Sequence, residues 1–368
     1  MLFKYGKAVE GKYFYDRLIM QKEIESYIKL EQPFMIKAPR RFGKTSLIKH
    51  AMSKLNKEYL YIDFRKTPRV EVVNEKVADY LYSNMGISGA INQLKENAVS
   101  FLISNKTTIN IKTPLLETAT ELFSNQKIVQ EEKLMQYLDM LNELGEESDQ
   151  VFYVVLDEFQ DVKKISSSDY DILEMLRGTL QHHQNICYVF AGSNMTMMTQ
   201  IFENTNSGFF NSCRKLKLFP FEIDVLHIEL LKAFKSIKVV FEDDNDLKVI
   251  LKRLNGHPAN TMMVMQNIEI QSMQKDLQLI TSKEIETAYT RAFEELSDLI
   301  SEYLKEIKSK DHLHDVIYRT VRNQRQVLSP GSLLQKRNLL VKMGYINKTE
   351  RGEYEVIDGF LKEELLSE

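Results

Sequence analysis

The sequence predicts an α/β fold with a parallel sheet, followed by a helical region and a small C-terminal module. Three observations support this prediction. Short β-rich runs alternate with helical stretches as far as Pro220, one of these runs is apolar at every position, and the strand pattern fades after Pro220. Strands that alternate with helices are typical of parallel sheets with right-handed crossover connections.

The predicted strands are short. They are Phe34–Lys37, Tyr59–Phe64, Val151–Leu156, Ile186–Ala191 and Leu216–Phe219. The third strand is apolar on both faces, as expected for a strand that is buried between two layers of helices. Between the second and third strands the pattern is helical, and Leu134, Leu138 and Leu141 share one face of a predicted helix over Glu131–Leu144. We therefore predict a helical insertion at about residues 68–150 within one sheet.

The chain after Pro220 is predicted to form two further parts. Helical patterns continue to about Lys310 and contain Gly256-His257-Pro258, a turn followed by a helix start. The last part contains two predicted helices and two short β-like runs, at 313–322, 333–343, 345–348 and 353–357. Helix, turn, helix, hairpin is the order of a winged helix. The predicted division is a core over residues 1–221, a helical lid over residues 222–310 and a winged helix over residues 311–368.

Composition excludes several classes of protein. The 368 residues are 43% hydrophobic and 27% charged, which is enough apolar material for a core and argues against a disordered or fibrous chain. No apolar run approaches the roughly 18 residues of a membrane span, so we predict no membrane contact. The net charge of −3 argues against nucleic-acid binding over the whole surface. Cys187 and Cys213 lack the spacing of a disulfide framework or metal site, which favours a cytoplasmic location.

The most informative stretch is a loop between a predicted strand and a predicted helix. It reads Ala38-Pro39-Arg40-Arg41-Phe42-Gly43-Lys44-Thr45-Ser46. Such a P-loop (Walker A) cradles phosphates because its backbone N–H groups and the helix N-terminus point toward one anion. Lys44 would reach the β- and γ-phosphates of ATP or GTP, and the Thr45 hydroxyl would ligate Mg²⁺. Arg40 and Arg41 could contact the nucleotide, or pair with acidic groups or a neighbouring subunit.

Two further strand ends carry polar residues. Val151–Leu156 runs into Asp157-Glu158, the Walker B arrangement, in which the aspartate holds Mg²⁺ and the glutamate polarises the attacking water. Ile186–Ala191 runs into Gly192-Ser193-Asn194. If this strand lies between the other two, Ser193 or Asn194 would sit beside the γ-phosphate. The three motifs together predict a P-loop NTPase core of the additional-strand, catalytic-glutamate type.

These residues resemble a known family. The segments that carry the resemblance are Phe14-Tyr15-Asp16-Arg17, Pro39-Arg40-Arg41-Phe42-Gly43-Lys44-Thr45-Ser46-Leu47, Leu156-Asp157-Glu158-Phe159-Gln160 and Ala191-Gly192-Ser193. In this order they are similar to the archaeal-type ATPase family, a branch of the STAND group within the AAA+-like NTPases. The resemblance covers roughly Phe3 to Phe221 and, more loosely, the C-terminal module. It implies a nucleotide-binding α/β domain, a lid and a winged helix, related to origin-recognition and initiator ATPases.

The resemblance also implies roles for residues outside the three motifs. Phe14 to Arg17 match the segment that runs beside the adenine in such proteins. Arg214 is displaced by about two positions from the family's usual arginine, so it is either an arginine finger or a plain surface arginine. Gly256-His257-Pro258 resembles the family's lid motif, in which His257 could sense the nucleotide, although a structural histidine is the interpretation we favour.

A local excess of positive charge marks the C-terminal module. The stretch from Lys305 to Arg351 contains eleven Lys and Arg residues and four Asp and Glu residues. In a winged helix the second helix and the wing contact duplex DNA, so these residues could bind double-stranded DNA.

The sequence as a whole predicts an ATP-dependent, ATP-hydrolysing molecular switch whose nucleotide state sets the pose of the lid and winged helix. Two alternatives remain open. One is a DNA-binding regulator or a replication or mobile-element factor with a mainly structural nucleotide site. The other is a signalling scaffold that binds a protein partner, or a second copy, through the winged helix.

Overall fold

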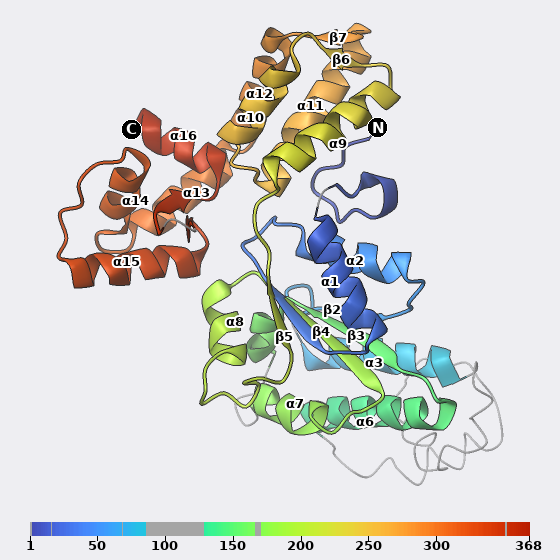
Figure 1. Cartoon of the computed structure of the whole chain (residues 1–368). Helices are drawn as coiled ribbons and strands as arrows, with labels where there is room; N and C mark the ends of the chain where they lie inside the picture. Colours follow the sequence, from blue (N-terminus) through green and yellow to red (C-terminus); the bar gives the residue numbers. More distant parts are fainter. Residues whose placement is uncertain (1, 16, 68, 86–128, 166–170, 350–351) are drawn as a thin grey trace.

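The computed structural model describes residues 2–15, 17–67, 69–85, 129–165, 171–349 and 352–368. Figure 1 shows a sheet with its covering helices, a second group of helices above them, and a third group to one side. Of the predicted insertion at residues 68–150, the described parts are α3 (Val70–Met85), α6 (Gln130–Ser148) and their immediate flanks. The stretch from 86 to 128 lies outside the described residues.

The core is built on a five-stranded parallel sheet with strand order β2-β3-β4-β1-β5. The strands are β1 (Phe34–Lys37), β2 (Leu60–Asp63), β3 (Phe152–Asp157), β4 (Ile186–Gly192) and β5 (Arg214–Lys217). All residues of β3 and β4 are buried. Because β4 pairs with both β1 and β3, the additional strand lies between the two motif strands, which confirms the predicted core type.

The last strand was predicted at Leu216–Phe219 but lies two residues earlier, at Arg214–Lys217. It occupies the edge of the sheet and pairs only with β1 among the described strands. An edge strand tolerates exposed basic side chains, and Arg214 and Lys215 are both exposed. A prediction based on apolar residues therefore places the start of this strand too late. Phe219 was predicted to belong to this strand, but it follows the end of the strand and its side chain is 52% exposed.

Helices cover both faces of the sheet. On one face, α1 (Leu18–Lys29) and α2 (Lys44–Lys54) pack against one alternating set of strand residues, including Tyr153 and Val155. On the other face, α3, α6, α7 (Ile172–Leu180) and α8 (Met195–Phe202) pack against the opposite set, including Val154 and Leu156. The alternation follows from the period of two along a strand. It confirms that β3 is buried on both faces.

The chain from Ile223 to Lys308 is mainly helical. Its elements are α9 (Ile223–Ser236), β6 (Val240–Phe241), α10 (Asp244–Arg253), α11 (Pro258–Lys275), β7 (Leu279–Ile280), α12 (Ser282–Glu295) and α13 (Ser297–Lys308). Pro258 occupies the first turn of α11, where its missing N–H has no helical partner to lose. We call this region the helical region.

The C-terminal module comprises α14 (Leu313–Val321), α15 (Pro330–Met343), the antiparallel strands β8 (Ile346–Lys348) and β9 (Tyr354–Val356), and α16 (Gly359–Ser367). Residues 350 and 351 of the predicted hairpin turn lie outside the described residues. Helix α16 was not predicted, although Phe360, Leu361 and Leu365 are fully buried at helical spacing. In the described part of the chain, no helix has the length and apolar character to cross a bilayer.

Candidate functional site

The phosphate loop joins β1 to α2 at the carboxyl edge of the sheet. Gly43 caps the helix at a φ of 80°, in the left-handed region that glycine adopts without strain. The Lys44 amine donates to the carbonyl oxygens of Ala38, at 2.9 Å, and Pro39, at 3.1 Å. Burial lowers the pKa of Lys44 to about 8, although Glu158 and Asp157 favour its charged form. The amine is therefore held at the centre of the loop, close to two carboxylates.

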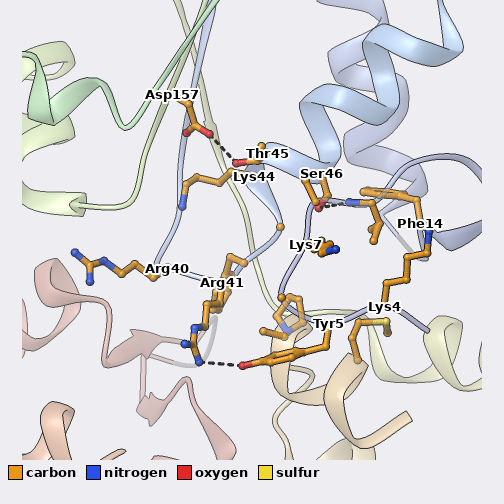
Figure 2. A pocket seen from close by; sticks show the side chains of 18 of the residues that line it. Lys4, Tyr5, Lys7, Phe14, Arg40, Arg41, Lys44, Thr45, Ser46 and Asp157 are labelled. Carbon is orange, nitrogen blue, oxygen red and sulfur yellow. Dashed lines mark hydrogen bonds between the residues drawn. The ribbon is translucent and has the colours of Figure 1, made fainter. Parts of the chain in front are cut away.

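Asp157, at the end of β3, accepts three hydrogen bonds. The Thr45 hydroxyl donates to its Oδ2 atom at 2.7 Å, as Figure 2 shows, and the Tyr61 hydroxyl donates to the same oxygen at 2.5 Å. The Glu158 N–H donates to Oδ1 at 2.9 Å. One hydroxyl and one carboxylate side by side fit Mg²⁺, which takes few protein ligands and completes its shell with water and phosphate oxygens. Consistently, the described residues contain no cluster of three or more His, Cys, Asp or Glu side chains arranged for a metal.

Glu158 lies next to Asp157 in the left-handed region, at a φ of 52°. Its carboxylate accepts from the Ser193 hydroxyl at 2.6 Å, the Ser193 N–H at 3.1 Å and the Gln160 amide at 2.7 Å. Arg65 forms an ion pair with it at 2.9 Å. Burial alone would raise the pKa of Glu158, but Lys44, these hydrogen bonds and Arg65 together lower it. Glu158 is therefore a carboxylate at neutral pH, with its oxygens engaged.

The two sensor candidates differ in direction. Ser193 faces Glu158, whereas the Asn194 side chain accepts from the Met197 N–H at 3.1 Å and caps α8. Gly192 precedes them, and a Cβ atom there would overlap the Met198 sulfur and lie 2.5 Å from Gln160 Oε1. A residue larger than glycine would therefore displace Met198 and the Gln160 amide that contacts Glu158.

Two residues of the site were missed by the sequence analysis. Tyr61 and Arg65 come from β2 and the turn after it, beside β3 in the sheet. Because the carboxyl ends of parallel strands share one edge of the sheet, polar residues near the end of β2 were the signal that could have found them.

The site opens into a cavity of about 660 Å³. The phosphate loop from Arg40 to Ser46, together with Asp157 and Glu158, forms one part of its lining. The N-terminal segment and the helical region form the rest, with Tyr5, Val9, Phe14, Pro258, Met262 and Tyr303 among the lining residues. Figure 2 shows this arrangement around Lys44 and Thr45.

The other predicted contact residues take several positions. Phe14 lines the cavity and stacks on His50, with ring centroids 4.5 Å apart. Arg17 is buried outside the lining, donating to the Phe42 carbonyl at 2.9 Å. The Ser46 hydroxyl accepts from the Val9 N–H at 3.2 Å, so it holds the N-terminal segment against α2.

The two loop arginines point in different directions. Arg41 donates to the Tyr5 hydroxyl at 3.2 Å, and Figure 2 shows Arg40 extending away from Tyr5. Within the described residues neither arginine forms an ion pair, so the predicted pairing with acidic groups of this chain is not seen there.

Two residues implied by the resemblance, Arg214 and His257, do not line the cavity. The Arg214 N–H donates to the Pro33 carbonyl, which places Arg214 at the amino end of β5, opposite the phosphate loop. Arg214 is therefore not an arginine finger within its own molecule. His257 is buried and its Nδ1 accepts from the Asn260 N–H at 3.3 Å, as expected for a structural histidine that caps α11. Burial lowers its pKa.

Comparisons with known proteins give two findings. Residues 14–264, well over half of the chain, match a family described as an ATPase domain predominantly from Archaea. The fold is similar to that of a Walker-type ATPase of Pyrococcus abyssi, at 17% identity, a TM-score of 0.68 and full coverage of both chains. It is also similar to the ORC2 protein of Aeropyrum pernix in ADPNP and ADP complexes, at 12% identity, a TM-score of 0.54 and coverage of 100% and 97%. No curated protein matches the sequence significantly.

Proposed function

The chain belongs to this archaeal ATPase family, and we propose that it binds Mg·ATP in the cavity beside α2 and hydrolyses it with Glu158 as the general base. One observation carries the proposal. Lys44, Thr45, Asp157 and Glu158, from two strand ends far apart in the sequence, meet at one edge of the sheet and line one cavity. This is the set of groups that phosphoryl transfer to water requires.

Each residue would have a distinct role. The backbone N–H groups of the loop and the Lys44 ammonium would hold the β- and γ-phosphates. Thr45 and Asp157 would hold Mg²⁺, which neutralises phosphate charge. Glu158 is ionised and could accept a proton from water, but Ser193, Gln160 and Arg65 now engage its oxygens. Hydrolysis would therefore be slow until these contacts loosen.

The test is equilibrium binding of labelled ATP with Mg²⁺. Lys44→Ala should abolish binding, because it removes the charge that meets the phosphates. Lys54→Ala is the matched control, since Lys54 lies at the far end of the same helix and pairs with Glu25 at 2.7 Å. Equal affinity of the wild-type protein and Lys44→Ala would contradict the proposal, as would a wild-type protein that binds no ATP.

We further propose that the helical region acts as a lid coupled to the nucleotide through an N-terminal strap, residues 2–15. At one end of the strap, the N–H groups of Leu2 and Phe3 donate to the buried Glu269 carboxylate of α11, at 2.5 and 3.0 Å. The Phe3 ring is fully buried and lies 4.8 Å from the Phe234 ring.

The other end of the strap is fixed to the helix that follows the phosphate loop. Val9 donates to Ser46, and the Gly11 N–H donates to His50 Nδ1 at 3.1 Å. A movement of the lid would therefore pull on the first turns of α2, next to the phosphates. Because the middle of the strap lines the cavity, nucleotide would contact the same segment.

Phe3→Ala tests this coupling. Removing the buried ring should release the lid end of the strap and weaken ATP binding by about tenfold, within the usual range of coupling between sites. Phe210→Ala is the control, because Phe210 is 38% exposed and lies in the turn that precedes β5. ATP affinity that is the same in both variants would refute the coupling.

The C-terminal module contacts the phosphate loop from its outer side, which supports a switch controlled by nucleotide. A Cβ atom at Gly344 would lie 3.1 Å from the Pro39 side chain. Lys217 donates to Asn347 at 3.1 Å, and Thr196 donates to the Lys342 carbonyl at 3.4 Å. We propose that the core ends near residue 221 and that residues 311–368 form a winged helix. We also propose that the protein works as a STAND-type switch in the cytoplasm. Its buried free thiols suit such a reducing compartment.

Binding of double-stranded DNA is the second candidate function, because several basic side chains of this module are not paired with an acidic side chain of the described residues. Among the described residues Arg325, Lys342 and Lys348 have no acidic partner, while Arg319 pairs with Asp315 and Lys336 with Asp311. The charge excess is partly offset, since Glu368, the residue after α16, pairs with Lys308 at the end of α13. The surface available for phosphates is thus smaller than the charge count suggests.

Salt-dependent duplex binding distinguishes this candidate from a protein scaffold or self-association. Arg325→Glu with Lys348→Glu should weaken binding and reduce the slope of log affinity against log salt by about two, one for each lost phosphate contact. Lys29→Glu, on the exposed face of α1, is the control. No duplex binding, or an unchanged salt slope, would favour the scaffold.

A further inference from the structure

Tyr61 is a residue of the site to which the family motifs assign no role. It lies on β2, lines the cavity, and its hydroxyl donates to Asp157 Oδ2 at 2.5 Å. The ring is half-buried against the hydrophobic cluster that α1 and α2 form with the sheet, and the Lys49 ammonium lies 5.0 Å from the centroid of the ring. The phenol is therefore held from both sides, with its hydroxyl directed at one carboxylate oxygen.

The three donors to Asp157 are not equivalent. The Glu158 N–H fixes Oδ1, while Thr45 and Tyr61 both donate to Oδ2. Thr45 is itself the other residue that would hold Mg²⁺, so its hydroxyl oxygen would be shared between the ion and the hydrogen bond to Oδ2. Tyr61 has no such second task. Tyr61 is therefore the donor to Oδ2 that would not also be a ligand of the ion.

We propose that Tyr61 is a positioning residue for Mg²⁺, acting through Asp157; this inference rests on the proposed Mg·ATP site. Side chains that orient a metal-binding carboxylate typically change metal affinity by tenfold or more when they are removed. Without the Tyr61 hydroxyl, the Asp157 carboxylate could rotate about its last torsion. Mg²⁺ binding would then have to restrict that rotation, which would reduce the affinity for the ion.

Tyr59 provides a matched control. It precedes β2 by one residue, packs partly buried against the same hydrophobic cluster, and has no hydrogen-bond partner for its hydroxyl among the described residues. Tyr59→Phe and Tyr61→Phe therefore remove the same atom from neighbouring positions, but only the second removes a contact with Asp157.

The experiment measures the affinity of fluorescent ADP for the full chain, once with Mg²⁺ and once with EDTA. The ratio of the two affinities reports the contribution of the ion and needs no hydrolysis. Tyr61→Phe should lower this ratio about tenfold by weakening binding in Mg²⁺, with affinity in EDTA unchanged. Tyr59→Phe should leave both values as in the wild type. The shift in melting temperature caused by Mg·ADP gives the same comparison on folded protein.

The outcomes separate this inference from the proposed function. A wild-type protein that binds no ADP in either condition would refute the Mg·ATP site itself. If the wild type shows a Mg²⁺ effect and Tyr61→Phe keeps or increases the ratio, the positioning role alone is refuted. It is also refuted if Tyr61→Phe weakens binding equally with Mg²⁺ and with EDTA, because that result indicates a general packing effect.

Discussion

The buried lysine of the phosphate loop predicts an unusual dependence of nucleotide affinity on pH. Burial lowers the pKa of Lys44 to about 8, and the phosphates of a bound nucleotide would restore the charged form. Binding above pH 8 must therefore take up a proton. Nucleotide affinity is therefore highest at a pH where Lys44 is already charged, and it falls as the pH rises through 8.

The size of the effect can be worked out from that pKa. Between pH 7.5 and 9.5 a lysine with a pKa of about 8 loses most of its charge, so affinity should fall roughly 25-fold. A lysine at its ordinary pKa of about 10.4 would change affinity by only about 10% over the same range.

Fluorescent ADP titrated at fixed ionic strength across this range is the assay. Lys44→Arg is the control, because arginine stays charged throughout; it should bind with a pH-independent affinity whatever its absolute value. A fall of less than twofold in the wild type would refute the reasoning. An equal fall in Lys44→Arg would assign the effect to another group.

Three further predictions concern the contacts around the site. Arg65→Gln should raise basal ATP turnover by up to about fivefold, because it removes a half-exposed ion pair that holds Glu158; reduced or unchanged turnover would contradict this. Gly192→Ala should lower the free energy of unfolding by about 1–3 kcal/mol through crowding against buried side chains, measured by urea unfolding, and wild-type stability would show that the site can relax. Gly344→Ala, at a φ of 84°, should strain the end of α15 by about 1 kcal/mol and loosen the C-terminal module from the phosphate loop. Faster proteolysis of that module is the expected sign, and unchanged cleavage would argue against it.

Much of the core could be predicted from the sequence. The periodicity of apolar residues located the strands within about two residues, and the polar residues at three strand ends indicated the site. The three motifs together also predicted a core of the additional-strand type, and β4 does lie between β1 and β3. These features depend on local pattern and on the shared carboxyl edge of a parallel sheet.

The remaining features depend on which side chains meet across the fold. Tyr61 and Arg65 look like ordinary strand and turn residues until β2 is placed beside β3. Ser193 and Asn194 are both polar, and only the start of α8 decides that Asn194 becomes a cap. The resemblance suggested Arg214, but pairing with β1 places it at the wrong end of the sheet. Polar residues near the end of β2 were a signal for the first of these outcomes, but the other two depend on contacts that the local sequence does not indicate.

Glu158→Gln tests the central claim most directly, with ATP binding and single-turnover hydrolysis measured on the same sample. The substitution keeps the size of the side chain and its contact with Ser193 but removes its ability to accept a proton. We expect ATP affinity close to that of the wild type and hydrolysis reduced by at least about a hundredfold, as is typical when a general base is lost. Hydrolysis at the wild-type rate would show that Glu158 is not the base, and would contradict the mechanism proposed for this site.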